Sequence, residues 1–313
     1  MTVNWGFLGA GFVASRGLAP AVHAAQGATL YAVASRDEKR SATLEPERVH
    51  ATYDDLLADD RVDAVYISLS NSQHLEWVTK SLEAGKHVLC EKPLGLNAAE
   101  TQAMFDVAAQ HDRLLIEAVW GRWHPRYARI VELVTRGEIG EIQHIETAFT
   151  FTSEMTENYR LSPEMGGGAL LDVGCYQAHA WVALTNGAPN LEIDNLERVV
   201  GPTGIDLTTD VTVRLNGSIT AHAVSSFALP SQQLFIIRGS QGQISTEAGE
   251  SFTTWNEACS LRVNDAVENF SVTNSFVEMV ENVSHVVDGR EGWYVPSADS
   301  IRVAQILDSI AQH

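Results

Sequence analysis

Lys92 follows an apolar run, residues 87–90, that is predicted to form a β-strand. In a parallel sheet the end of such a strand lies at the carboxyl edge, where open α/β sheets bind their ligands. Pro93 restricts Lys92 to an extended backbone, so the side chain has a defined direction. A lysine held there can hydrogen-bond a substrate oxygen, stabilise developing alkoxide charge and exchange a proton. A solvated surface lysine is the alternative, but the position at the strand end favours a catalytic role.

Asp172 and Tyr176 are four residues apart on a predicted helical stretch, 170–184, and therefore share one face of it. The triplet at residues 166–168 is all glycine, which allows another part of the backbone to approach closely. A carboxylate there could orient the lysine or the substrate, and a phenol can pass a proton. From these residues alone, a capping Asp172 and a core Tyr176 explain the pattern equally well.

A glycine-rich turn, Gly9-Ala10-Gly11-Phe12-Val13-Ala14, joins the first predicted strand to a helix and matches G-x-G-x-x-A. The first glycine permits the tight turn, the second lets the backbone approach a pyrophosphate, and the alanine keeps helix and strand close. The helix N-terminus adds unpaired N–H groups and a positive dipole end. The turn therefore predicts a dinucleotide site lined by its first five residues.

The end of the second predicted strand bears on the choice of cofactor. An NAD site expects an acidic residue there, for the ribose 2′-hydroxyl. Here Ser35 can donate to a phosphate oxygen, and Arg36 offers a planar, charged fork suited to a 2′-phosphate. We interpret Asp37 as the N-cap of the next helix, pointing away from the ribose. NADP(H) is therefore preferred, with NAD(H) as the alternative.

These residues lie on two kinds of architecture. Through residues 1–121, near-continuously apolar strands alternate with helices, which predicts a doubly wound parallel sheet, the Rossmann fold. From residue 122 to 313, strands follow one another with few helices, which predicts an α+β domain with a large, mainly antiparallel open sheet. The C-terminal helix, although assigned to the second domain, can pack back on the first domain. The expected strands are 3–8, 28–34, 64–69, 87–90, 114–119, 142–152, 208–215, 218–227, 234–238 and 243–246.

Composition excludes several classes of function. The net charge of −19 argues against a nucleic-acid partner, and the apolar runs are too short to span a membrane. Cys90, Cys175 and Cys259 form no CxxC pair, so we expect neither a disulfide framework nor a zinc site. No other His, Asp or Glu spacing suggests a metal. We expect no signal peptide and a cytoplasmic location.

Four motifs together resemble the glucose-fructose oxidoreductase / inositol dehydrogenase / rhizopine-catabolism (GFO/IDH/MocA) family, over essentially the whole chain. The motifs are GAGFVA at residues 9–14, Glu91-Lys92-Pro93, EAVWGRWHP at 117–125 and GGGALLDVGCYQAH at 166–179. The third and fourth look most like dimeric dihydrodiol dehydrogenases and NADP-dependent sugar dehydrogenases. Each motif is moderately specific, whereas their order and spacing together are strongly so.

This resemblance implies hydride transfer between nicotinamide and a hydroxyl or carbonyl carbon of a cyclic polyol, sugar or dihydrodiol. Lys92 matches the family's catalytic lysine, and Asp172 and Tyr176 match the acid and the later residue of the second domain. The cofactor set then also includes Ser70, Asn71, His74, Glu91 and Lys92. Ser70 departs from the family, where proline is common, which puts the geometry of that loop in doubt.

Substrate contacts are less defined by the sequence. Trp120 and Arg122 follow the sixth strand, where an aromatic ring can stack on a sugar face or simply pack. We assign both to substrate binding, place selectivity in the loop 153–161, and interpret Glu117 as a structural carboxylate. A catalytically silent NADP-binding sensor or scaffold is the alternative function, but such a protein would not need Lys92, Asp172 and Tyr176 together.

The predicted strand 142–152 bears on assembly because its residues alternate between two faces. Family likeness suggests that the open face of this sheet, with His144 and Glu146, meets a second subunit across a two-fold axis. We therefore expect a homodimer or a dimer of dimers. A monomer with a polar outer face is the alternative, because that face also carries threonines.

Overall fold

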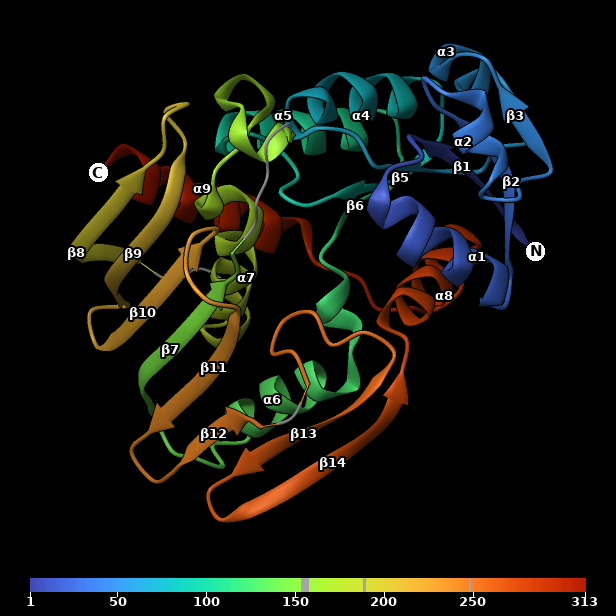
Figure 1. The fold of residues 1–313 in the computed structure, drawn as a ribbon. Helices are drawn as coiled ribbons and strands as arrows, with labels where there is room; N and C mark the ends of the chain where they lie inside the picture. Colours follow the sequence, from blue (N-terminus) through green and yellow to red (C-terminus); the bar gives the residue numbers. More distant parts are fainter. Residues whose placement is uncertain (153–157, 188–189, 248) are drawn as a thin grey trace. The chain divides into compact units, whose positions relative to one another are not determined.

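The computed structural model describes residues 1–152, 158–187, 190–247 and 249–313, which form two compact units (Figure 1). The first unit consists of Met1–Gly95, Ala99–Trp123 and Asn274–Ser297. The second consists of Leu96–Ala98, His124–Thr273 and Ala298–His313. The first unit thus takes in a late segment of the chain, whereas we expected the second domain to run from residue 122 to 313.

The first unit contains a six-stranded parallel sheet in the order β3-β2-β1-β4-β5-β6, the expected Rossmann arrangement. Its strands are β1 (Val3–Leu8), β2 (Ala28–Ala34), β3 (Arg48–His50), β4 (Ala64–Ile67), β5 (His87–Glu91) and β6 (Leu115–Ala118). Its helical segments are η1 (Ala14–Leu18), α1 (Ala19–Ala24), α2 (Glu38–Ala42), α3 (Tyr53–Leu57), η2 (Asn71–Gln73), α4 (His74–Glu83), α5 (Ala98–Gln110), η3 (Trp120–Trp123) and α8 (Ser275–Val287).

Helices cover both faces of this sheet because every strand except the edge strand β3 buries side chains on both sides. Trp5 and Phe7 of β1 pack in one core with α1 and α8, whereas Leu8 packs in a second core with α3, α4 and α5. Helix α8 lies beside α1 (Figure 1), and the buried Trp5 indole donates to Ser284 Oγ of α8 at 3.1 Å. These contacts explain why α8 belongs to the first unit although it follows the second sheet in the sequence.

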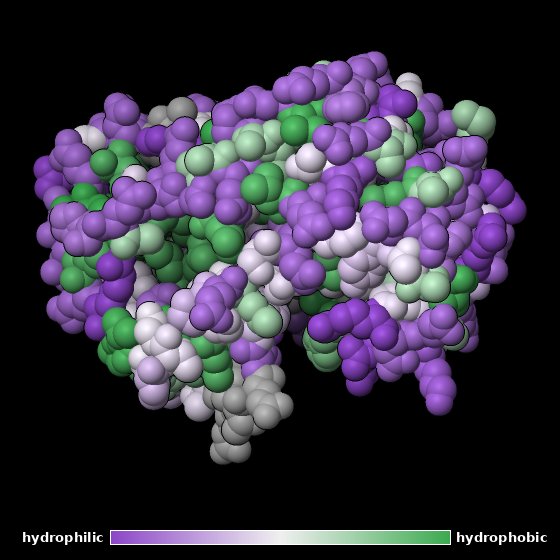
Figure 2. Space-filling model, turned by 90° about the horizontal axis from the view of Figure 1, so that it is seen from above, coloured by the Kyte–Doolittle hydropathy of each residue, from purple (hydrophilic) through white to green (hydrophobic). Residues whose placement is uncertain are grey.

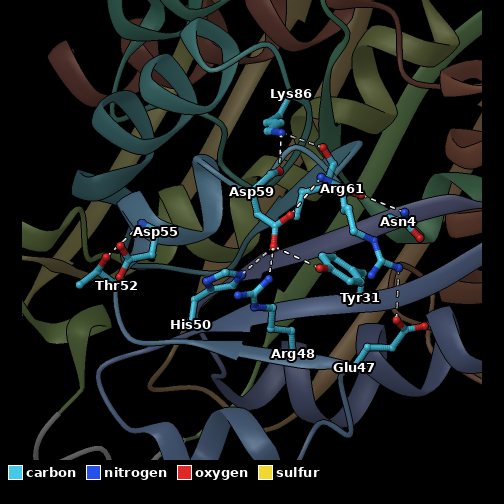
Figure 3. A network of polar contacts seen from close by, with 11 residues as sticks. Asn4, Tyr31, Glu47, Arg48, His50, Thr52, Asp55, Asp59, Arg61 and Lys86 are labelled. Carbon is cyan, nitrogen blue, oxygen red and sulfur yellow. Dashed lines mark hydrogen bonds and ion pairs between the residues drawn. The ribbon is translucent and has the colours of Figure 1, made fainter.

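A polar network closes the loop between α3 and β4 (Figure 3). The Asp59 carboxylate lies 3.2 Å from each of three donors, on Tyr31 of β2 and on Arg48 and His50 of β3. The buried Lys86 ammonium donates to the backbone oxygens of Asp59 and Val62, at 2.8 and 2.9 Å. One loop is thereby bonded to two strands and to the start of a third, which fixes this edge of the sheet.

The second unit contains an eight-stranded sheet in the order β14-β13-β12-β11-β7-β10-β9-β8. Its strands are β7 (Ile142–Thr150), β8 (Leu191–Val200), β9 (Asp206–Leu215), β10 (Ile219–Ser226), β11 (Gln232–Gly239), β12 (Gln243–Thr246), β13 (Glu257–Val263) and β14 (Ala266–Thr273). Its helical segments are α6 (Pro125–Thr135), η4 (Tyr159–Leu161), η5 (Pro163–Met165), η6 (Leu170–Gly174), α7 (Cys175–Leu184) and α9 (Ser297–Gln312). Only β7 and β10 pair in parallel among the paired strands of this sheet. The expected large, mainly antiparallel sheet is confirmed.

The strand β7 shows how the two faces of this sheet differ. Ile145 and Thr147 are buried on the side where Phe149 meets the ring of Tyr176 of α7, and helices α6 and α7 lie against this face (Figure 1). His144 and Glu146 point to the opposite face and are partly exposed. The predicted alternation of the strand is therefore present.

Two expected absences can be checked on the described residues. None of their helices is long and apolar enough to cross a membrane, and none of their His, Cys, Asp and Glu residues cluster as metal ligands would. The face of the molecule drawn in Figure 2 is mostly hydrophilic, in keeping with the acidic composition.

Candidate active site

The glycine-rich turn owes its first glycine to the fold itself. Gly9 has φ +100°, and a Cβ on it would lie 2.5 Å from the backbone oxygen of Ser68, which follows β4. Gly11 differs, because the nearest atom to a Cβ there, Ser68 Oγ, is 3.7 Å away, an ordinary contact distance. The protein's own packing therefore requires glycine at residue 9 but leaves space beside residue 11.

The helix that follows the turn presents its N-terminus next to this space. Its first intrahelical bond runs from Ser15 N to Gly11 O at 2.9 Å, so the N–H groups of Phe12 and Val13 precede the ladder. The Phe12 side chain is 75% exposed, whereas Ala10 and Ala14 are buried. Any contact of a phosphate with this turn would be made by backbone N–H groups, as the motif predicts.

The end of β2, which was predicted to bear on the choice of cofactor, is followed by a turn at residues 35–37. Asp37 caps α2, with Oδ1 accepting from Lys39 N at 2.9 Å and Arg40 N at 3.2 Å. This confirms our interpretation of Asp37 as an N-cap. The Ser35 hydroxyl lies 2.8 Å from both Asp37 O and Ser41 Oγ, and its expected phosphate contact stays a prediction. Arg36 is exposed.

The loop after β4 holds His74 inside the protein. His74, expected among the cofactor-binding residues, is fully buried, with Nδ1 3.0 Å from Pro93 O and Nε2 3.3 Å from Leu69 O. Burial lowers the pKa of His74, and a neutral ring donates one N–H at a time. His74 therefore joins the loops after β4 and β5 from inside the protein. Nearby, Ser70 Oγ donates to Gln73 Oε1 at 3.0 Å, and Asn71 is 3% exposed.

Buried carboxylates hold the turn that carries Lys92. Glu91 accepts the Tyr66 hydroxyl at 2.6 Å through Oε1 and Lys92 N at 3.3 Å through Oε2. Glu117 of β6 accepts Leu94 N at 3.1 Å, the structural role expected of it. Burial and, next, the Glu91 carboxylate raise the pKa of Tyr66 well above its usual range, so the phenol keeps its proton.

The side chain of Lys92 is left partly buried, at the end of β5. Its backbone N–H bonds Glu91, the following carbonyl of Pro93 faces His74, and Leu94 N bonds Glu117. Each of these contacts restrains the backbone on either side of Lys92. Glu91, predicted to contact the cofactor, is 8% exposed and also supports this turn.

In the second unit, Asp206 of β9 fixes the start of the helix that carries Asp172. Its Oδ2 accepts Leu170 N at 2.8 Å and the Thr209 hydroxyl at 2.7 Å. Burial raises the pKa of Asp206. Gly168, at φ +114°, lies so close to Asp206 Oδ1 that no side chain fits there. Asp206, not Asp172, thus bonds the first N–H of this helix.

Asp172 is itself 4% exposed and takes part in an ion pair that the sequence did not reveal. Arg160 Nε donates to Asp172 Oδ2 at 2.7 Å. Tyr176, one turn later, is 6% exposed and packs its ring against Phe149 and Phe252, at centroid distances of 5.5 and 6.4 Å. Asp172 therefore does not cap the helix, whereas the ring of Tyr176 does lie in an aromatic cluster.

Two polar contacts keep this helix in register on the sheet. Ser225 Oγ of β10 donates to Gln177 Oε1 at 2.6 Å, and Gln177 Nε2 donates to Val224 O at 2.9 Å. Gly174 lies against the same serine, since a Cβ there would approach Ser225 Oγ to 2.9 Å. The position of Asp172 is thus set by its own turn and by the strand beneath it.

The residues assigned to substrate binding after β6 are packing residues of the first unit. Trp120 is 7% exposed and stacks on Phe276 of α8, with ring centroids 4.5 Å apart. Arg122 is 8% exposed and lies over the ring of Trp293, 5.5 Å from its centroid. Both side chains are therefore largely buried and pack on residues of the same unit, and their assignment to substrate binding stays a prediction.

The expected selectivity loop, 153–161, is only partly described, because residues 153–157 lie outside the described part of the chain. Its last residues form η4, which supplies Arg160. Sequence reasoning missed Arg160 and Asp206 as parts of the site. The one available signal was that Arg160 stands in a loop already singled out, shortly before the glycine triplet.

Comparison with known proteins gives matches over both units. Residues 3–119 match the oxidoreductase family with an NAD-binding Rossmann fold, and residues 127–245 match the GFO/IDH/MocA C-terminal domain. A D-xylose 1-dehydrogenase (NADP(+)) of Haloferax volcanii is 32% identical, covering 98% of this chain and 95% of the relative. A trans-1,2-dihydrobenzene-1,2-diol dehydrogenase of Xenopus tropicalis is 28% identical, covering 100% and 98%.

A solved structure agrees with these matches. KijD10, a 3-ketoreductase from Actinomadura kijaniata in complex with NADP and TDP-benzene, is 26% identical, with a TM-score of 0.89 over 100% of this chain and 98% of that one. The resemblance inferred from the four motifs is thereby confirmed. The chain belongs to the GFO/IDH/MocA family of oxidoreductases.

Proposed function

We propose that this protein is an NADP(H)-dependent oxidoreductase acting on a cyclic polyol, sugar or dihydrodiol. Hydride would pass between nicotinamide and a carbon that bears a hydroxyl or carbonyl group. The single observation that carries the proposal is the braced turn at Lys92, whose backbone is held by buried Glu91, Glu117 and His74. Relatives named as xylose and dihydrodiol dehydrogenases match nearly the full chain, which supports the substrate class.

The cofactor assignment is supported by two features of the first unit. Gly11 has no steric need to be glycine, so its missing side chain provides room for a pyrophosphate beside the helix N-terminus. The Asp37 carboxylate is engaged in capping, which leaves the exposed Arg36 as the charged group for a 2′-phosphate. We therefore propose NADP(H) rather than NAD(H), as for the relatives whose names and complexes include NADP.

We assign the chemistry to Lys92, Asp172 and Tyr176. The bound nicotinamide supplies the hydride acceptor or donor. In the oxidative direction, the substrate hydroxyl loses its proton while hydride leaves the same carbon, and the neutral amine of Lys92 or the phenolate of Tyr176 accepts that proton. A donor aimed in advance at the substrate oxygen stabilises alkoxide charge without reorganisation, and the braced turn meets that requirement at Lys92.

We further propose a homodimer, or a dimer of dimers, formed through the sheet face that carries His144 and Glu146, in a cytoplasmic protein. Three buried free cysteines are in keeping with a reducing compartment. The mixed charges of this face, with Arg238 bonding Glu146 at 2.9 Å, suit a self-complementary contact. Light scattering at micromolar concentration tests the assembly: a species near the 34.1 kDa chain mass would exclude it.

The test of the proposed function is a nicotinamide absorbance assay against sugars, inositols and dihydrodiols, with NADP and NAD in parallel. We expect turnover of at least one substrate, with a lower KM for NADP. Tight NADP binding with no turnover across the panel would favour a silent sensor or scaffold. Turnover that prefers NAD would overturn the cofactor assignment alone.

A further inference from the structure

We infer that Arg160 is a positioning residue that keeps Asp172 ionised, so that Asp172 acts as a hydrogen-bond acceptor and proton exchange is left to Lys92 and Tyr176. The inference rests on the function proposed above and assigns separate roles within its catalytic set. The ion pair carries it: Arg160 Nε lies 2.7 Å from Asp172 Oδ2, with side-chain exposures of 28% and 6%.

The surroundings make this pair different from the other ion pairs of the unit. The pair of Arg262 and Glu247 has the same Nε–O distance, 2.7 Å, but its side chains are 40% and 36% exposed. Water screens such a pair, whereas a shielded guanidinium strongly favours the charged form of its partner. Burial, the largest single influence, lowers the pKa of Arg160, but Asp172 together with Tyr159 and Tyr176 outweighs it, so the pKa of Arg160 is raised.

The backbone around Arg160 is arranged to bring it to the helix. Asn158 Oδ1 accepts Arg160 N at 3.1 Å, and Arg160 O accepts Gly168 N at 2.9 Å. Gly167 lies against the Arg160 carbonyl so closely that no Cβ fits between them. Two glycines of the triplet therefore serve the approach of the 158–162 loop to the turn that carries Asp172. Close backbone approach was expected here, and the approaching chain is this loop.

The role of Asp172 follows from its charge. A buried carboxylate without a partner is driven towards its protonated form by desolvation, whereas a paired one stays an anion. An anionic carboxylate accepts hydrogen bonds and has no proton to give. Asp172 is thereby suited to orient a substrate hydroxyl or an ammonium group, while the phenol of Tyr176 and the ammonium of Lys92 retain exchangeable protons.

The test is the pH dependence of kcat and KM for Arg160→Gln, with Arg262→Gln as the matched control. We expect kcat to fall by about tenfold or more at pH 7, since a charge-assisted contact is lost. The acid limb of the kcat profile should move to higher pH, because Asp172 then protonates more readily. Affinity for NADP, whose site we assign to the first unit, and the control variant should match the parent.

Arg160→Lys serves as the second variant, because it keeps the positive charge. It should fold if the glutamine variant does not, restore part of kcat and retain the parent's acid limb. The inference would be overturned if the acid limb of the kcat profile did not shift in Arg160→Gln, or if only KM rose in that variant. It would also be overturned if the acid limb shifted in Arg160→Lys. A parent protein that turns over no substrate refutes the proposed function and this inference with it, whereas an active parent separates the two.

Discussion

The turn at Lys92 and the helix turn at Asp172 are both held in place by buried polar contacts, but the contacts act on different atoms. At Lys92 the carboxylates of Glu91 and Glu117 bond backbone N–H groups. At Asp172 the contact from Arg160 falls on the carboxylate itself. Removing a support should therefore change geometry in the first region and charge in the second.

This difference suits the proposed tasks of the two residues. A lysine that exchanges a proton must be aimed while its ammonium group stays free to titrate, so backbone contacts are the appropriate support. An acceptor must not take up a proton, so a fixed opposite charge is the appropriate support. The predictions below test each region, beginning with the largest expected effect.

Lys92→Met should lower kcat by about 100-fold or more, the scale of one general acid-base or oxyanion contact, and leave NADP binding intact. The supports of the turn bond backbone atoms, so they remain in the variant. The measurement is steady-state turnover with cofactor titration. Lys80→Met, on an exposed i,i+4 pair with Glu76, is the control. Near-normal turnover in the Lys92 variant would remove this residue from the catalytic set.

Arg36→Ala should raise the KM for NADP by about ten- to a hundredfold, because a charge-assisted contact to the 2′-phosphate is lost. The KM for NAD, which lacks that phosphate, should change little and is the internal control. Steady-state kinetics with both cofactors provide the measurement. An equal rise for the two cofactors would mean that Arg36 acts on the fold of the turn after β2.

Glu117→Ala tests the backbone support of the Lys92 turn. It leaves the buried N–H of Leu94 without this acceptor, at a cost of about 1–3 kcal/mol in the free energy of unfolding. We expect kcat to fall by up to about tenfold, since the turn loosens while the lysine keeps its charge. Glu117→Gln retains an acceptor oxygen, so its kcat and its free energy of unfolding should lie between those of the parent and those of Glu117→Ala. Urea unfolding measures the change in stability, and steady-state turnover measures the change in kcat. A shift in the pH dependence of kcat would contradict a purely geometric role for Glu117.

Strands buried on both faces were predicted well from the sequence. The ranges Val3–Leu8, Ala28–Ala34 and Gln243–Thr246 agree to the residue, because continuous or alternating apolar residues end there at clear turn signals. The strands β3, β8, β13 and β14 were missed. β3 has three residues, and β8 and β14 are mostly polar edge strands; in β8 the alternation that starts at Leu191 is also interrupted by a register shift after Ile193.

In the site, too, sequence reasoning found only what a local pattern reveals. Motifs located the glycine turn, Lys92, Asp172 and Tyr176, because close spacing along the chain reveals them. Their supports come from distant positions: Tyr66 and Glu91 are 25 residues apart, and Leu170 and Asp206 are 36 apart. Such pairs arise only from strand order and helix packing. The burial of His74, Trp120 and Arg122 by tertiary packing was equally impossible to see from the sequence.

Asp206→Asn should have the smallest effect. It tests how the helix turn around Asp172 is held in place while the ion pair between Arg160 and Asp172 stays intact. The asparagine amide oxygen can still accept from Leu170 N and Thr209 Oγ, so the helix keeps its cap.

Burial raises the folded-state pKa of Asp206 above its ordinary value of 3.8. The stability contributed by the protonated carboxyl is therefore fully present below 3.8 and is lost as pH rises through the folded-state pKa. Asparagine does not titrate, so the stability of the variant relative to the parent should increase with pH across that window and then level off. Thermal unfolding between pH 4 and pH 8 measures this difference, with kcat at pH 7 expected to stay within about threefold of the parent. A variant that loses stability relative to the parent as pH rises would show that the Asp206 carboxylate is held as an anion, and that both acids at this helix turn, not Asp172 alone, depend on their charge.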